Sequence, residues 1–228
     1  MTNTDTKDKP DLLKQMSSVV SHEIRNPLAI ISNSLYFIKT KLNAGGAPLD
    51  PKVAKHIGVI ESEVKHSNEI IEEMLSFTRK RELAPTPLSV DGLISEQGAA
   101  YRVPENVALK VAEDSSNPRV NADKEIFCYA LRCVLSNAVL AMPEGGTVTV
   151  ACSHDDSTAY ITVTDTGPGL PGGDGEKVFE PFFTTRPRGM GLGLPITRKY
   201  MELHGGAAKA ENVPGGGAKI TLSLPLCK

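Results

Sequence analysis

Apolar residues recur every three or four positions through the first third of the chain, the spacing of one face of an α-helix. One series ends near Leu42, and a second begins near Val53 after the loop at 43–51. The pattern predicts an antiparallel helical hairpin over residues 11–83, behind a disordered polar lead at 1–10. Its expected seam is Leu13, Val20, Ile24, Pro27, Ile31, Leu35, Ile38 and Leu42 in the first helix, and Val53, Ile57, Ile60, Val64, Ile71 and either Met74 or Leu75 in the second.

Two helices alone leave half of such a seam in water. We therefore expect two chains to pair through the hairpin into a four-helix bundle. The alternative is a hairpin that covers its seam by packing against the second domain of its own chain.

The pattern changes after residue 83. The segment 84–89 contains two prolines and no period, which predicts a linker. Beyond it, helices are expected at 90–101, from an N-cap at Asp123 to about Met142, and at 195–204. Alternating or apolar segments predict strands at 107–111, 147–152, 159–165, 207–212 and 218–226. This order predicts an α+β two-layer sandwich over residues 90–228.

Composition narrows the class of protein. The chain has 228 residues with 40% hydrophobic and 23% charged side chains and a net charge of −2, which is typical of a soluble protein and gives no reason to expect nucleic acid as a partner. The most apolar segment, Ile126–Met142, contains Arg132 and Asn137 and is too short to span a bilayer. The four cysteines lack metal-type spacing and fit reduced thiols in the cytoplasm.

Two glycine-rich segments, DTGPGL at 165–170 and GMGLGL at 189–194, flank EPFFTT at 180–185 and two arginines, Arg186 and Arg188. Glycine permits close approach of the backbone to a ligand, and the second segment leads into a helix N-terminus. Unpaired N–H groups and the helix dipole both favour phosphate there. The arrangement predicts a nucleotide site.

Three polar side chains are candidates for chemistry. Asn137 lies in an otherwise apolar helix, so its amide either ties helix to strand or binds a polar group such as Mg²⁺. Asp165 ends an alternating strand at a turn, where it either caps its own backbone or, from the surface of a cleft, accepts an exocyclic amine. His22 is expected opposite the apolar seam beside Glu23, where it is either solvated surface or a nucleophile.

Together these motifs resemble those of the sensor histidine kinases of two-component systems. SHEIRNPL at 21–28 is similar to their phospho-acceptor box, LSNA at 135–138 to the N box, EPFFTT to the F box, and the glycine segments to the two glycine boxes. All five occur in family order over about 17–228. Within the family, the details resemble the soluble kinases of nitrogen regulation.

The resemblance implies a dimerisation and phosphotransfer hairpin followed by a Bergerat-type ATP-binding domain, with a mobile lid at about 171–189. It implies that His22 takes the γ-phosphoryl group of ATP, that Glu23 assists as base, and that the group passes to an aspartate of a response regulator receiver domain. Asn26 would orient water for dephosphorylation of that regulator. Asn137 would hold Mg²⁺ and Asp165 the adenine amine. The remaining nucleotide-site residues would be Gly167, Gly169, Thr184, Thr185, Arg186, Gly189, Gly191, Gly193 and Leu194.

The chain departs from the family pattern at two positions. Cys133 and Leu140 stand where the family often has an asparagine and a basic residue, which shifts the expected phosphate charge to Arg186, Arg188 or the metal. These departures keep open a kinase-like scaffold that binds ATP without phosphorylating a histidine. A gyrase-, mismatch-repair- or chaperone-type ATPase is a third hypothesis, although it gives SHEIRNPL no role. No sensory domain precedes the hairpin in this sequence, so we expect either an excised core or a separate sensory partner.

Overall fold

The computed structural model describes residues 9–44, 50–79, 81–112, 116–186 and 189–227, with the backbone alone at 9–23 and 43–44. Two compact units divide the chain, Met1–Lys80 and Arg81–Lys228. Arg188, one of the two arginines expected to carry phosphate charge, lies outside the described residues. Each unit is described by itself below.

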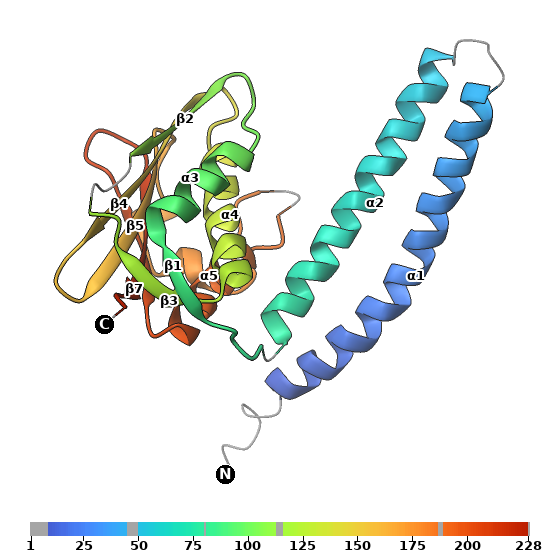
Figure 1. The fold of residues 1–228 in the computed structure, drawn as a ribbon. Helices are drawn as coiled ribbons and strands as arrows, with labels where there is room; N and C mark the ends of the chain where they lie inside the picture. Colours follow the sequence, from blue (N-terminus) through green and yellow to red (C-terminus); the bar gives the residue numbers. More distant parts are fainter. Residues whose placement is uncertain (1–8, 45–49, 80, 113–115, 187–188, 228) are drawn as a thin grey trace. The chain divides into compact units, whose positions relative to one another are not determined.

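The first unit is a hairpin of two long helices, α1 (Lys9–Ala44) and α2 (Pro51–Thr78), which lie side by side (Figure 1). Ion pairs join Arg25 to Glu72 at 2.6 Å and Lys39 to Glu61 at 2.8 Å, so the residue later in α1 pairs with the residue earlier in α2 and the helices are antiparallel. Pro27 lies inside α1, which continues through it. The predicted hairpin is confirmed.

Within one chain the hairpin buries only part of its apolar seam. Leu35 on α1 is buried, as are Ile57, Val64 and Ile71 on α2. The other seam positions with large exposed side chains are Ile24, Ile31, Ile38 and Leu42 on α1 and Val53 and Ile60 on α2. A line of apolar residues at helical spacing is therefore not covered by the hairpin itself.

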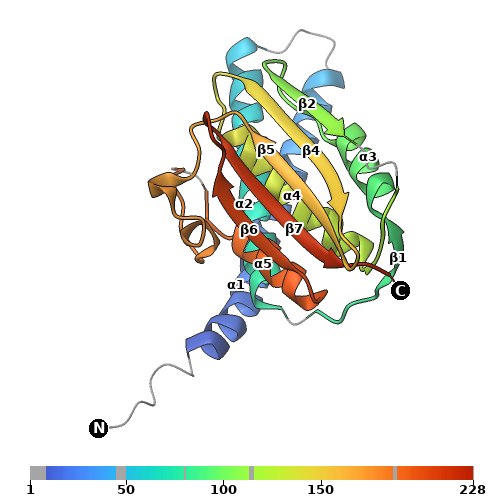
Figure 2. The same cartoon turned by 90° about the vertical axis from the view of Figure 1, so that its left-hand side faces the viewer.

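The second unit is a mixed five-stranded sheet with helices on one face (Figure 2). The strand order is β2 (Val107–Ala112), β4 (Gly146–His154), β5 (Thr158–Asp165), β7 (Ala218–Pro225) and β6 (Ala207–Asn212), with only β2 and β4 parallel. The helices are α3 (Val90–Ala100), α4 (Lys124–Leu140) and α5 (Gly193–Leu203). Alternate residues of β5 and β7 are buried, and with the buried face of α4 they form the core. The predicted two-layer sandwich is confirmed.

The segment expected to be a structureless linker contains a strand. β1 (Thr86–Ser89) pairs antiparallel with β3 (Arg119–Ala122), and neither short strand was expected from the sequence. The Ala84 N–H also donates to Asp123 Oδ2 at 3.1 Å. Asp123 is the expected N-cap of α4, with Oδ1 accepting from Ile126 N. Burial alone would raise the pKa of Asp123, but these backbone N–H groups hold it below its ordinary value. Residues 84–89 are thus fastened to the second unit.

Among the helices that the structure describes, none combines the length and the hydropathy that crossing a bilayer requires. Two single-turn 3₁₀ helices, η1 (Pro171–Gly173) and η2 (Lys177–Phe179), follow the first glycine-rich segment.

Candidate functional site

Helix α4 contacts both glycine-rich segments along one stripe of its surface. A methyl group at Gly193 would lie 3.7 Å from Cys133 Cβ, and one at Gly167 would lie 3.3 Å from the Ala141 carbonyl oxygen. Asn137 stands between them, since positions 133, 137 and 141 follow one another at four-residue intervals on the same helix face. Tyr101, at the end of α3, hydrogen-bonds Ser136 next to Asn137, and burial raises the pKa of this phenol. The fold therefore gathers the N box and both glycine boxes along α4.

Asp165 is the last residue of β5 and forms the start of the first glycine segment. Its Oδ1 accepts hydrogen bonds from Gly167 N at 2.9 Å and from Ala218 N, on β7, at 3.2 Å. Both bonds involve the same oxygen, so among the described residues Oδ2 has no protein partner. Oδ2 is therefore the atom able to accept from an amine.

Asp165 is not at the surface of a cleft, as the sequence suggested, but only 7% exposed. The reason is the C-terminal hairpin, whose turn Gly215–Gly217 brings β7 and its Ala218 N–H against the carboxylate. A buried carboxylate costs free energy unless it is hydrogen-bonded, and here two backbone donors supply the bonds. The carboxylate thus serves the fold, and its role as an acceptor for a ligand amine stays a prediction.

The second glycine segment leads into α5. Gly191 has φ +71°, and a methyl group there would lie 2.5 Å from the Phe183 carbonyl oxygen, so only glycine fits. Gly193 and Leu194 are the first residues of α5, and no side chain caps this end. Helix N–H groups that lack a cap are available to an anion. A helix N-terminus without a side-chain cap is therefore present after the second glycine segment, and its binding of phosphate stays a prediction.

The arm between the F box and this helix is folded on itself. Thr184 and Thr185 are exposed, and Thr184 Oγ1 accepts from Arg186 N at 3.1 Å. The Gly189 N–H donates to the Arg186 carbonyl oxygen at 3.2 Å, which closes the turn. We call residues 184–190 the phosphate arm, of which 187 and 188 lie outside the described residues.

The phosphate arm contacts α4 through one side chain. The Arg186 guanidinium Nη2 donates a hydrogen bond to Asn137 Oδ1, so the structure brings together two residues that are 49 positions apart in the sequence. The amide oxygen thus faces a positive charge, an environment that a hard cation also supplies. Among the described residues, Asn137 Oδ1 thus bonds Arg186 and not a strand, and its role as a ligand of a metal stays a prediction.

A metal at this position would take few ligands from the protein. In the described part of the chain, no three His, Cys, Asp or Glu side chains gather as a metal cluster. Mg²⁺ held with nucleotide typically needs only one or two protein oxygens, the rest coming from phosphates and water. Asn137 Oδ1 fits that requirement.

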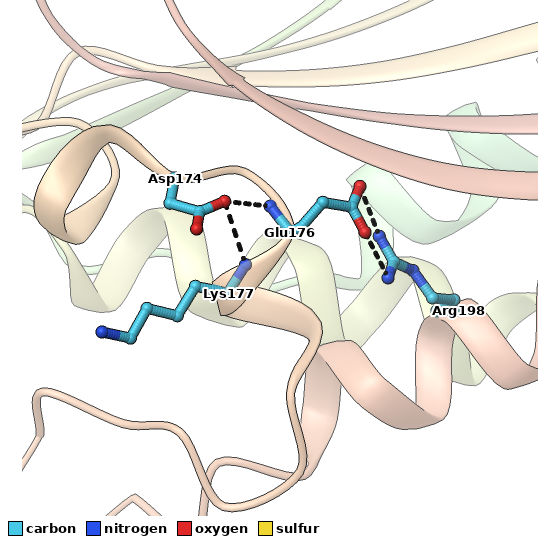
Figure 3. A network of polar contacts seen from close by, with 4 residues as sticks. All are labelled: Asp174, Glu176, Lys177 and Arg198. Carbon is cyan, nitrogen blue, oxygen red and sulfur yellow. Dashed lines mark hydrogen bonds and ion pairs between the residues drawn. The ribbon is translucent and has the colours of Figure 1, made fainter.

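The first part of the predicted lid is fastened to α5. Asp174 Oδ1 accepts from Glu176 N and Lys177 N, and the Glu176 carboxylate makes two bonds with the Arg198 guanidinium, at 2.9 and 3.2 Å (Figure 3). Arg198 also lies over the ring of Phe179, 3.9 Å from its centroid. A forked ion pair with a stacked arginine holds geometry better than a single contact. Within the expected lid, the structure thus distinguishes this anchored base from the phosphate arm.

The hairpin carries the other predicted catalytic residues. His22 and Glu23 lie within α1, and their side chains fall outside what the structure describes. Asn26, one turn further along the helix, is exposed. The predicted roles of these three residues remain predictions.

Some residues at the site were not expected from the sequence. Asn212 Oδ1 accepts from Leu170 N at 2.7 Å, and Met142 packs beside Gly167. Arg198 and Glu176 fix the base of the lid. Asn212 is the last residue of an ordinary edge strand and carries no local signal, since its partner lies 42 residues earlier.

Comparison with known proteins defines the two units as domains. A family model described as the His Kinase A (phospho-acceptor) domain matches residues 12–83. A second, described as the histidine kinase-, DNA gyrase B- and HSP90-like ATPase, matches residues 122–228. The first model contains His22, and the second contains every nucleotide-site residue named above. The class is thus a phospho-acceptor hairpin joined to an ATPase-like domain.

Comparison with solved structures identifies the family. The mycobacterial sensor histidine kinase MprB gives TM-score 0.56 at 30% identity, covering 63% of this chain and 98% of that one. The histidine kinase ThkA, solved in complex with the response regulator protein TrrA, gives TM-score 0.68 at 28% identity over 98% of this chain and 64% of that one. The chain belongs to the sensor histidine kinase family.

Curated relatives agree and show how much of a whole kinase is present. The sensor histidine kinase ZraS of Escherichia coli O157:H7 is 29% identical over 223 residues, which are 96% of this chain and 48% of that protein. Sporulation kinase A of Bacillus subtilis is 28% identical, over 96% of this chain and 35% of that protein. The chain spans about half the length of the curated relatives it matches, or less.

Proposed function

We propose that this chain is an ATP-dependent protein-histidine kinase that phosphorylates its own His22 and passes the phosphoryl group to an aspartate of a response regulator receiver domain. The observation that carries the proposal is the presence, in one chain, of a phospho-acceptor domain and a separate ATPase-like domain. The contacts of Asp165, Asn137 and the α5 N-terminus support the nucleotide half.

The nucleotide roles are divided along α4. Asp165 Oδ2 accepts the adenine amine, and Gly167 and Gly169 keep the backbone beside the base free of side chains. The N–H groups near Gly189, Gly191, Gly193 and Leu194 bind phosphate oxygens, with Thr184 and Thr185 beside them. Such fixed donors stabilise charge that develops during transfer. Arg186 supplies positive charge in place of the basic residue that Leu140 replaces.

Mg²⁺ on Asn137 Oδ1 would neutralise charge on the phosphate oxygens. In the transfer itself, an imidazole nitrogen of His22 attacks the γ-phosphorus; a P–N bond forms, the P–O bond to the β-phosphate breaks, and ADP leaves with the electron pair. Glu23 takes the imidazole proton. The receiver carboxylate then attacks the same phosphorus and breaks the P–N bond. Asn26 orients water for hydrolysis of the resulting acyl phosphate.

The proposal includes a homodimer through the hairpin. Exposed apolar residues line both helices in one chain, among them Ile31, Ile38 and Ile60. A second copy that buries them completes a four-helix bundle. Sedimentation velocity should give the mass of two chains, and a monomer at micromolar concentration would contradict this part of the proposal.

Location and input complete the proposal. The four cysteines are free thiols, which are typical of the reducing cytoplasm, so we include a cytoplasmic location. The receiver partner is supported by the complex of ThkA with TrrA. A sensory partner, on this chain's own longer form or on another protein, supplies the signal.

Labelling from ATP tests the central step. Wild type incubated with γ-labelled ATP and Mg²⁺ should acquire label that is lost in acid and stable in alkali, which distinguishes phosphohistidine from phosphoserine. His22→Gln should acquire none. His56→Gln is the matched control, since His56 is an exposed histidine on the other helix of the hairpin, and it should label as wild type does.

Two outcomes would overturn the proposal in different ways. Label that persists on His22→Gln would refute the acceptor assignment. Tight ATP binding by wild type without any phosphohistidine would favour the ATP-binding scaffold, for which Cys133 and Leu140 are the sequence argument.

A further inference from the structure

The first glycine segment is held at its far end by a residue of the C-terminal hairpin. Asn212 closes β6, and its Oδ1 accepts the Leu170 N–H at 2.7 Å. A methyl group at Gly169 would lie 2.6 Å from this oxygen, and one at Gly173 would lie 3.6 Å from Asn212 Nδ2. The amide of Asn212 therefore packs directly against residues 169–173.

The near end of the same segment depends on the neighbouring strand. Ala218, which donates to Asp165 Oδ1, is the residue of β7 paired with Asn212 in the sheet. One rung of the β6–β7 ladder thus supplies both attachments: Ala218 to Asp165 and Asn212 to Leu170. Between them, Gly169 has φ +85°, a left-handed backbone conformation that only glycine adopts easily. The shape of the segment therefore depends on these two attachments.

We propose that Asn212 is a positioning residue for recognition of the purine base: it fixes the loop 165–170 in the orientation in which Asp165 meets the 6-amino group. The inference rests on the proposed ATP site and names a residue outside the five family motifs. Asn212 is exposed, so its replacement should perturb the loop more than the core. The specific consequence is that its loss weakens discrimination of the 6-amino group and not binding of the triphosphate.

Calorimetry with two nucleotides tests this on the full chain. Purine riboside triphosphate lacks only the 6-amino group of ATP, so the ratio of its Kd to that of ATP reports the base contact. Asn212→Ala should weaken ATP about five- to tenfold, as expected for one hydrogen bond, and purine riboside triphosphate less than about twofold. Asn212→Asp keeps an oxygen acceptor for Leu170 N–H and should restore most of the ratio.

The controls separate a positioning role from a structural one. Asn121→Ala removes another exposed strand asparagine, on β3, and should leave both affinities and their ratio unchanged. Equal weakening of both nucleotides in Asn212→Ala, or no weakening of either, would overturn the inference while leaving the kinase proposal intact. Wild type that binds neither nucleotide would overturn both.

Discussion

The base side and the phosphate side of the proposed nucleotide site are built in different ways. The loop 165–170 is attached at both ends to neighbouring strands: the Ala218 N–H donates to Asp165 Oδ1, and Asn212 Oδ1 accepts from the Leu170 N–H. The phosphate arm, 184–190, contains exposed threonines and reaches α4 through the hydrogen bond of Arg186 to Asn137. The base side therefore has its hydrogen bonds in place without a ligand, whereas on the phosphate side Arg186 occupies the oxygen that we propose for the metal.

This difference assigns separate tasks to the two sides. A preformed base site lowers the ordering that binding requires and so contributes affinity and selectivity. If Mg²⁺ binds Asn137 as proposed, the phosphate arm has to rearrange, because a guanidinium and Mg²⁺ repel each other and compete for one amide oxygen. The base of the lid, by contrast, is fixed to α5 by the ion pair of Glu176 with Arg198. Changes on the two sides should accordingly produce different signatures.

Asp165→Asn should have the largest effect. The amide preserves an oxygen for the Gly167 and Ala218 N–H groups, yet it removes the charge that strengthens a bond to the adenine amine. A hydrogen bond to a charged group contributes about 1.5–3 kcal/mol, so ATP affinity should fall on the order of 100-fold. Calorimetry should show the full loss of affinity for ATP and a smaller loss for purine riboside triphosphate, which lacks the 6-amino group.

Stability provides the check on that variant. Asp165 is buried, so a melting temperature lowered by less than about 5 °C is expected if the amide oxygen takes over both bonds. Asp156→Asn, an exposed aspartate in the β4–β5 turn, is the matched control and should change neither property. Unaltered ATP affinity in Asp165→Asn would remove the adenine contact from the site.

Gly191→Ala should act on the phosphate side alone. Gly191 and Gly172 have nearly equal positive φ, 71° and 68°, so alanine introduces a similar backbone strain of about 1–2 kcal/mol at either position. Only at Gly191 would the methyl group also collide, with the Phe183 carbonyl oxygen, whereas nothing lies within 4 Å at Gly172. Displacing the loop costs more than one phosphate bond, so ATP affinity should fall by at least about tenfold.

Adenosine distinguishes the two sides in this experiment. It lacks phosphates, so its binding, followed by NMR, should be the same in wild type and Gly191→Ala. Gly172→Ala should remain within about twofold of wild type for both ligands, since strain without collision is absorbed locally. Loss of adenosine binding in Gly191→Ala would mean that the two sides are not independent.

The sequence anticipated the elements better than the contacts between them. Helical periodicity identified the hairpin, and Asp123 marked the start of α4, because both signals are local. The burial of Asp165 and the bond of Leu170 to Asn212 both depend on residues more than 40 positions away in the sequence. No local sequence pattern could therefore predict them. β1 and β3 have only four residues each, which is too short for a clear alternation of apolar and polar residues. Val120 of β3 is fully buried, so this pair of strands depends on packing against the core.

Arg186→Gln should give the smallest and most specific change. Removing the guanidinium frees Asn137 Oδ1 for the metal, and it also removes a cation from the phosphates. ATP should therefore bind more weakly in EDTA, while the factor by which Mg²⁺ tightens binding should rise about three- to tenfold, the size of one hydrogen bond to a charged group. The quantity to measure is the ratio of the ATP Kd in EDTA to that in Mg²⁺.

Arg198→Gln is the control for that ratio, because Arg198 binds Glu176 and Phe179 at the anchored base and does not contact Asn137. It should leave the magnesium factor unchanged even if it loosens the lid. A factor that stays constant or falls in Arg186→Gln would show that guanidinium and metal do not compete at Asn137. The phosphate side would then need no more rearrangement on binding than the base side. The two sides would differ only in how their backbones are held.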